Sequence, residues 1–340
     1  MRLISKLAFV AASVFAAGTV LAQGKSAPPV QTLLIGNATA NDTQAAANDK
    51  LAELLTKYSN GRFKASARHG SALGGNAQMI AALQAGSIHG MIAPAGFTAS
   101  VVPEISMFDM PFLLPGRPAM ITAFAAQSKA AKMMMQAAEK KGIHVLAFHG
   151  IGPQSFLTRF PITKLADIQG KKFRVIPSPP RVGAYQDWGG VARPMEFHEV
   201  YTALQQGTLD GLENPPDVLY KMKMHEVAKY YTITEHFAFA SIMMVSKKWY
   251  DGLPKDLKSA VDRAGRDTVA FADAAYTKSQ DDSLEAMRKA ITVTDMPQAE
   301  IQKMKDLALK GVWERMKADP QKGPIAKLLL QDVANFNKKK

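Results

Sequence analysis

Residues 32–68 read TLLIGNATANDTQAAANDKLAELLTKYSNGRFKASAR, and this stretch decides the fold. Its first apolar run, residues 32–36, predicts a buried strand. Asn41-Asp42 can then cap a helix whose apolar residues recur at helical spacing, and Asn60-Gly61 ends that helix. Residues 62–68 predict the next strand. The order strand, helix, strand is typical of an α/β fold.

The same order continues downstream. Residues 76–85 predict a second helix, and Gly86 leads into a strand over residues 88–93. The five elements together give the β-α-β-α-β order of a doubly wound lobe. Ligands of such lobes bind at the ends of the strands, so we expect the ligand-binding face there.

Strand and helix patterns also fill most of the remaining chain. Residues 118–141 predict one long helix, followed by a strand at 143–149, a strand-helix series over 155–233 and an apolar strand at 239–246. The stretch from Lys255 toward Lys289 predicts a helix long enough, at ~1.5 Å per residue, to run along two lobes.

The first 22 residues have the charge, apolar core and small-residue order of a secretory signal peptide. Their apolar run is shorter than the roughly 20 residues that a membrane-spanning helix needs, so retention as an anchor is the weaker alternative. About 318 residues would follow cleavage, which exceeds the usual limit of roughly 250 to 300 for one core. Two lobes joined by short hinges are therefore expected.

The composition narrows the compartment and the partners. The chain has no cysteine, which excludes disulfides, thiolate metal sites and a lipidated cysteine. An exported chain without a lipid anchor fits the periplasm of a double-membraned bacterium. The net charge of +13 suits an anionic ligand weakly. Basic residues are spread along the chain rather than clustered, so we expect no nucleic-acid partner.

Signatures of catalysis are missing from the sequence. It contains no Gly-x-Ser-x-Gly elbow, no His-Glu-x-x-His pair, no GxxxxGK[ST] loop and no GxGxxG turn. We expect no metal, no cofactor and no enzyme. The alternative is a periplasmic enzyme acting on a small carboxylate, with Glu199, Glu213 or His198 as acid or base.

One arginine stands out because it lies inside an apolar strand. Residues 170–176 read GKKFRVI, and Arg174 at their centre must find a partner. A guanidinium grips a carboxylate with two parallel hydrogen bonds, so the partner is either a ligand or an acidic side chain of the protein. Residues 209–216, LDGLENPP, end a second strand at Asn214, which can both donate and accept or simply belong to a turn.

In their order and spacing, several blocks resemble the solute-binding proteins of tripartite ATP-independent periplasmic (TRAP) transporters. The likeness covers nearly all of the chain after the signal peptide. It rests on SNGRF (59–63), SALGG (71–75), AGSI (85–88), PE (103–104), DMPF (109–112), DIQGKKFRV (167–175), PMEFHEVYTALQQG (194–207) and LDGLENP (209–215).

The resemblance implies roles for individual residues. Arg174 would form a salt bridge with the ligand carboxylate, and Asn214 would contact the bound acid. Phe197 matches a position whose ring packs on the substrate, although a plain core role is an equal alternative. Asn37, after the first strand, is a further pocket candidate.

The sequence also departs from the family pattern. Gln154 stands where some acid-binding members carry a second arginine, which weakens the case for a doubly charged ligand. His89 replaces a usual aspartate, and Pro94 lies at the mouth of that strand. A monocarboxylate with an apolar or aromatic body therefore fits best.

The resemblance further implies the architecture and the mechanism. It implies a two-lobed periplasmic binding protein fold, with residues 28–151 and 240–279 in one lobe and residues 152–239 and 280–340 in the other. Hinge closure would trap a small carboxylate in the cleft, and the receptor, expected to be a monomer, would deliver it to membrane permease subunits.

Overall fold

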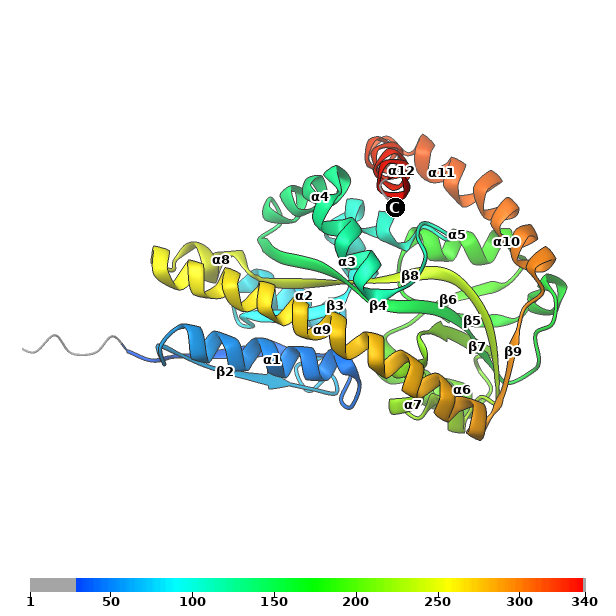
Figure 1. Cartoon of the computed structure of the whole chain (residues 1–340), viewed down its shortest axis with the longest axis horizontal. Helices are drawn as coiled ribbons and strands as arrows, with labels where there is room; N and C mark the ends of the chain where they lie inside the picture. Colours follow the sequence, from blue (N-terminus) through cyan, green and yellow to red (C-terminus); the bar gives the residue numbers. More distant parts are fainter. Residues whose placement is uncertain (1–28, 339–340) are drawn as a thin grey trace, which may run out of the picture.

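A mixed β-sheet forms the centre of the molecule, and helices cover it (Figure 1). The computed structural model describes residues 29–338, so the predicted signal peptide lies outside the described residues. Within this range the sheet has nine strands in the order β2-β1-β3-β8-β4-β7-β5-β6, and β9 pairs with β8 off this path. The strands are β1 (Gln31–Gly36), β2 (Phe63–Arg68), β3 (Gly90–Pro94), β4 (Ile143–Thr158), β5 (Lys172–Val175), β6 (Val191–Pro194), β7 (Gly211–Asn214), β8 (Tyr230–Ser246) and β9 (Thr292–Asp295).

The helices fall between and after these strands. The α-helices are α1 (Thr43–Tyr58), α2 (Asn76–Ala85), α3 (Pro118–Gln127), α4 (Lys129–Glu139), α5 (Pro179–Asp187), α6 (Val200–Gln205), α7 (Pro216–Lys221), α8 (Lys247–Asp251), α9 (Lys255–Ala290), α10 (Gln298–Lys310), α11 (Val312–Ala318) and α12 (Gly323–Asn337). Short 3-10 helices are η1 (Ala95–Ser100), η2 (Pro103–Asp109), η3 (Leu165–Ile168), η4 (Phe197–Glu199) and η5 (Met224–Glu226).

The predicted β-α-β-α-β unit is confirmed. Strand β1 pairs in parallel with both β2 and β3, and helices α1 and α2 make the two connections. Asp42 is the N-cap of α1, and its side chain accepts a hydrogen bond from the Ala45 backbone N–H. Gly86 ends α2 in the left-handed conformation that glycine adopts most readily. We call strands β1–β3 with α1 and α2 the first half of the molecule.

A second parallel group forms the other side of the sheet. Strand β5 pairs in parallel with β6 and β7, and α5 and α6 lie between these strands along the chain. Helix α7 follows β7 directly. We call strands β5–β7 with α5, α6 and α7 the second half.

Two long antiparallel strands, β4 and β8, join the halves and were only partly predicted. The apolar runs at 143–149 and 239–246 are the beginning of β4 and the end of β8, whose full lengths are 16 and 17 residues. Strand β8 pairs with β3 near its end, whereas β4 pairs with β7 near its own end. The pairing of β4 with β8 is irregular between residues 145 and 156. The predicted strand ended within this region, at residue 149.

The long helix α9 is confirmed, with 36 residues from Lys255 to Ala290. It contacts α1 of the first half and α7 of the second half, and it runs diagonally along both in Figure 1. The single helix predicted over 118–141 is wrong, because the chain breaks at Ser128. That residue is extended and caps α4, while Asp332 of α12 accepts hydrogen bonds from Ser128 Oγ (2.7 Å) and Ala130 N (2.9 Å).

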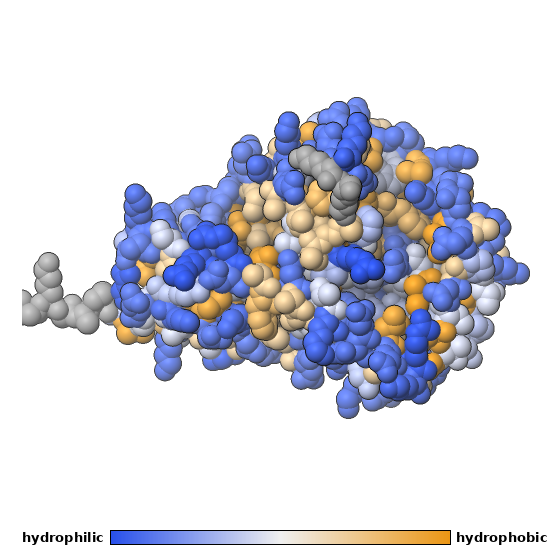
Figure 2. Space-filling view, in the orientation of Figure 1, coloured by the Kyte–Doolittle hydropathy of each residue, from blue (hydrophilic) through white to orange (hydrophobic). Residues whose placement is uncertain are grey.

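The described part of the chain has a largely polar surface on the face seen in Figure 2. Hydrophilic side chains cover most of the face seen in Figure 2, with small apolar groups near its middle. Among residues 29–338, no helix combines the length and the apolar character that a bilayer crossing requires.

Candidate ligand-binding site

A narrow pocket lies where the carboxyl ends of strands from both halves meet, as expected for doubly wound sheets. About 30 Å³ is open to the centres of water-sized molecules, which is room for only one or two waters. The structure therefore holds the pocket in a nearly closed form. Its walls consist of Ala38, Thr39, Asp42, Gln44, Asn76, Pro94, Phe97, Arg174, Ile176, Phe197, Asn214, Val218 and Phe239.

Arg174 reaches the pocket from β5 and is 2% exposed. Its Nε donates to the Met195 carbonyl at 3.0 Å, whereas Nη2 has no hydrogen-bond partner. The guanidinium carbon lies 5.8 Å from the Phe97 ring centre and 5.6 Å from that of Phe197. Burial lowers the pKa of Arg174 to about 10, so the group remains cationic at neutral pH. The result is a buried cation with a free donor between two aromatic rings.

Two buried carboxylates form ion pairs with another arginine, Arg181, and not with Arg174. Arg181 of α5 is fully buried, and its guanidinium donates to Asp109 at 2.8 Å and to Glu213 at 3.1 Å. The Tyr185 hydroxyl donates to the same Glu213. Burial raises the pKa of Glu213, and the Arg181 cation opposes that shift. Arg174 makes no ion pair within residues 29–338. Sequence reasoning did not identify Arg181.

Asn214 and Gln154 form a pair beside the arginine. Asn214 ends β7, lines the pocket and is 2% exposed. Its Oδ1 accepts from Gln154 Nε2 at 3.5 Å, and its Nδ2 has no partner. Gln154 lies on β4 and is fully buried, but it does not line the pocket. It supports Asn214 from behind.

Phe197 and Asn37 occupy different layers of the site. Phe197 lines the pocket and also packs in the hydrophobic cluster of the second half, so its position is compatible with either of its expected roles. Asn37 is fully buried and stands behind the wall. Its Nδ2 donates to the Thr39 carbonyl at 2.8 Å, and its Oδ1 accepts from Gln44 Nε2 at 2.8 Å. Asn37 therefore holds two wall residues in place.

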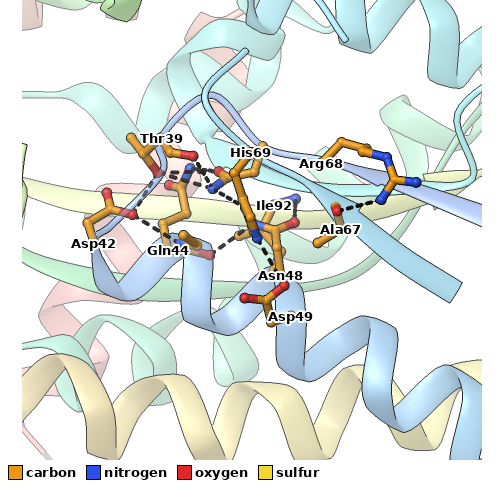
Figure 3. Close-up of polar contacts among 11 residues, drawn as sticks. Thr39, Asp42, Gln44, Asn48, Asp49, Ala67, Arg68, His69 and Ile92 are labelled. Carbon is orange, nitrogen blue, oxygen red and sulfur yellow. Dashed lines mark hydrogen bonds and ion pairs between the residues drawn. The ribbon is translucent and has the colours of Figure 1, made fainter. Parts of the chain in front are cut away.

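Polar wall residues of the first half were missed by the sequence analysis. Asp42 is 3% exposed, and its Oδ1 accepts from Thr39 Oγ1 at 2.6 Å and from Ala45 N at 3.0 Å (Figure 3). Its Oδ2 is buried without a partner. Burial raises the pKa of Asp42 to about 6. Its position in the loop after the first strand could have marked Asp42 as a pocket residue. The sequence analysis assigned it only the role of a helix cap.

Two carboxylates of the second half clasp helix starts of the first half. Glu196 accepts from the backbone N–H groups of Asn76 and Ala77, both at 3.0 Å, at the beginning of α2. Asp217 accepts from the Thr43 N–H at 3.1 Å, at the beginning of α1. Backbone donors at a helix start favour a negative charge. Both contacts bridge the two sides of the pocket.

Comparisons with known proteins identify the family and the fold. The model of a family described as bacterial extracellular solute-binding protein, family 7, matches residues 35–319. The C4-dicarboxylate-binding periplasmic protein of Rhodobacter capsulatus is 33% identical over 245 residues, covering 72% of this chain and 73% of that relative.

Solved structures share the whole fold. The sugar acid binding protein of Advenella mimigardefordensis, in complex with galactonate, has a TM-score of 0.86 and 27% identity, covering 91% of this chain and 99% of that one. A TRAP periplasmic solute binding protein of Desulfovibrio salexigens, with bound orotic acid, has a TM-score of 0.84 and 28% identity, covering 90% and 99%.

These matches confirm the resemblance and the two-lobed fold that it implied, and they give no support to the enzyme alternative. The related proteins bind solutes for transport. The chain belongs to family 7 of the bacterial extracellular solute-binding proteins, the binding proteins of TRAP transporters.

Proposed function

We propose that this chain captures one small organic acid in the pocket between its two halves, with Arg174 binding the carboxylate. The observation that carries the proposal is the buried guanidinium whose Nη2 has no partner in a pocket wall. A desolvated cation costs free energy unless an anion compensates it. Glu213 and Glu196 stabilise the cation at longer range, but no carboxylate of residues 29–338 forms an ion pair with it, so a ligand carboxylate is the natural partner.

The surrounding wall would orient the acid. Asn214 Nδ2 offers a second free donor on the same side of the pocket. Five apolar side chains, Phe97, Ile176, Phe197, Val218 and Phe239, supply most of the remaining contact surface. This lining supports an acid with an apolar face, in line with the monocarboxylate expected from Gln154 in place of an arginine.

Binding would require opening and closing of the two lobes, with residues 28–151 and 240–279 in one and residues 152–239 and 280–340 in the other. A pocket with 30 Å³ for water-sized molecules cannot admit an organic acid without opening. Closure would then bring Glu196 and Asp217 onto the helix starts of the first half. Ligand energy and these contacts together would favour the closed state.

The family and the predicted signal peptide support a periplasmic location and a membrane permease as the partner. Members are periplasmic solute-binding proteins that work with TRAP permease subunits. We propose that residues 1–22 direct export to the periplasm, and that the receptor delivers its acid there as a monomer to the permease. The segment itself lies outside the described residues.

Calorimetric titration with galactonate and orotate, after mass spectrometry of any copurifying acid, tests the proposal. Arg174→Met should weaken binding at least about tenfold, because a hydrogen-bonded ion pair contributes about 1.5–3 kcal/mol. Arg193→Met is the matched control, since Arg193 is exposed on the adjacent strand β6, opposite Arg174 in register. Equal affinity of wild type and Arg174→Met for the best-bound acid would refute the assignment.

A further inference from the structure

We infer that Asp42 is a second ligand anchor, accepting a hydrogen bond from a hydroxyl or ammonium group of the acid that Arg174 holds. The inference rests on the proposed function and specifies its substrate class. It assigns the pocket a direction, with free donors on the second half and free acceptors on the first. The preferred ligand is then an acid that also carries a donor, rather than a plain hydrocarbon acid.

The unpartnered atoms of the wall divide by chemistry and by side. Arg174 Nη2 and Asn214 Nδ2 are free donors, and both residues belong to strands of the second half. Asp42 Oδ2 and Asn76 Oδ1 are free acceptors at the starts of α1 and α2 in the first half. All four residues line the pocket, and none is more than 3% exposed.

Both free acceptors can be assigned from the chemistry of their groups. A carboxylate at Asp42 has only acceptors to offer when it is ionised. Asn76 Nδ2 donates to Glu196 Oε2 at 3.2 Å, which leaves Oδ1 of that amide as the free atom. Both residues line the pocket, where a donor group of a ligand would satisfy these two acceptors.

The cap role of Asp42 accounts for only one of its two oxygens. Oδ1 alone accepts from Thr39 and from the Ala45 N–H. A serine caps a helix as well as an aspartate does, without burying a second oxygen. Leaving a buried acceptor unpaired costs about 1–3 kcal/mol, so a purely structural cap gains nothing from Oδ2.

The charged neighbours of Asp42 do not neutralise it. Asp217 on α7 carries the same charge and disfavours ionisation of Asp42. Lys221 on the same helix attracts Asp42 but makes its ion pair with Asp217, at 2.8 Å. Burial and the Asp42 charge raise the pKa of Tyr276 on α9, yet the Tyr276 hydroxyl has no hydrogen-bond partner within residues 29–338. The carboxylate thus has room for a donor supplied from outside.

Matched acid pairs test the inference. Galactonate and hexanoate share a six-carbon chain and differ in hydroxyl groups, and mandelate and phenylacetate differ in one hydroxyl. Each acid is titrated against wild type, Asp42→Asn, Asp42→Ser and Arg174→Met. Glu53→Gln is the control, because it removes one carboxylate charge from an exposed site on the same helix, where Glu53 pairs with Lys50.

We expect wild type to prefer the hydroxylated member of at least one pair. Asp42→Asn and Asp42→Ser should weaken that member roughly tenfold or more and leave its hydrocarbon counterpart unchanged. Glu53→Gln should alter neither. Because both Asn and Ser keep the cap, thermal unfolding should report folded proteins.

The outcomes separate this inference from the proposed function. Equal effects of the Asp42 variants on both members of a pair, or no preference for either hydroxylated acid in wild type, overturn the role of Asp42. The carboxylate site at Arg174 survives those results if Arg174→Met still weakens all bound acids. Only unaltered binding in Arg174→Met overturns the proposed function itself.

Discussion

Arg174 and Arg181 show how two equally buried arginines take opposite roles. Arg181 is surrounded by its own counterions, Asp109 and Glu213, at hydrogen-bonding distance. Arg174 has one backbone carbonyl and two aromatic rings but no counterion bonded to it. Internal neutralisation makes the first a structural group, whereas the second retains binding capacity.

The raised pKa of Asp42 leads to a prediction about the stability of the folded protein, and this prediction does not depend on any ligand. Its pKa in the folded protein is about 6, above its ordinary value of 3.8, because burial disfavours the charge. The folded state thus binds this proton more tightly than the unfolded state, and ionisation costs stability. The cost is absent below pH 4, grows as the pH rises from 4 to 6 and stays constant above that, at about 3 kcal/mol.

Asp42→Asn should therefore raise the melting temperature at pH 7.5 and lose that advantage as the pH falls to 4. Thermal unfolding of both proteins across this range measures the difference. Glu53→Gln, at an exposed site on the same helix, provides the reference profile. A constant difference at every pH would contradict the raised pKa.

Residues of the site could be predicted where a family block or a strand end fixed their place. Arg174, Asn214 and Phe197 line the pocket because the ends of β5 and β7 and the loop before α6 converge there. Gln154 and Asn37 were placed close by but lie one layer behind. Their exact depth depends on the tertiary packing of β4 and of the loop after β1, which no local pattern encodes.

At the scale of elements, helix starts do much of the positioning. Helices α1 and α2 both begin at the pocket, and both receive a carboxylate from the second half. Glu196 lies just before η4 and α6 in the chain, but its carboxylate caps α2, 120 residues earlier. Gly75 permits this approach, since a Cβ there would lie 2.9 Å from Glu196 Cδ.

Glu196→Gln should loosen the closed state. Its carboxylate interacts with the α2 start through two backbone N–H groups, and removing the charge forfeits about 1–2 kcal/mol of that interaction. We expect ligand dissociation to accelerate by roughly 5- to 30-fold, with little change in association.

Stopped-flow release of the best-bound acid measures this effect. Glu199→Gln removes the same charge three residues away, from an exposed side chain, and should leave the rate unaltered. Equal rates for wild type and Glu196→Gln would show that the clasp does not control opening.

Elements with strong local signals were predicted well, and those shaped by distant contacts were not. The β-α-β-α-β unit was predicted from caps, turn residues and apolar runs within its own sequence, and α9 from one long helical stretch. The break at Ser128 lacks a proline or glycine and depends on Asp332 from the last helix. The continuity of β4 past Gly150 and Gly152 is likewise maintained by pairing with β8, a long-range contact.

For the whole molecule, we expect the crossing of β4 between the halves to control how the proposed lobes move. At this point Gln280 of α9 donates to the Ile151 carbonyl at 2.9 Å and accepts from the Asp217 N–H at 3.2 Å. One side chain thus ties the long helix to the crossing strand and to the start of α7. The geometry requires Gly152, whose φ of 156° suits glycine and whose Cβ would lie 2.8 Å from Gln280 Nε2.

Gly152→Ala should therefore affect both stability and closure. The backbone conformation alone costs about 1–3 kcal/mol for a residue with a side chain. Displacement of Gln280 would also release α9 from the crossing, so ligand affinity should fall together with the melting temperature. Gly170→Ala is the matched control, because Gly170 also has a positive φ, 68°, but a Cβ there meets nothing within 4 Å. It should lose about 1 kcal/mol of stability and keep full affinity. If the two variants lose stability equally and both bind normally, Gln280 does not couple the helix to the crossing, and the lobes must be held by other contacts.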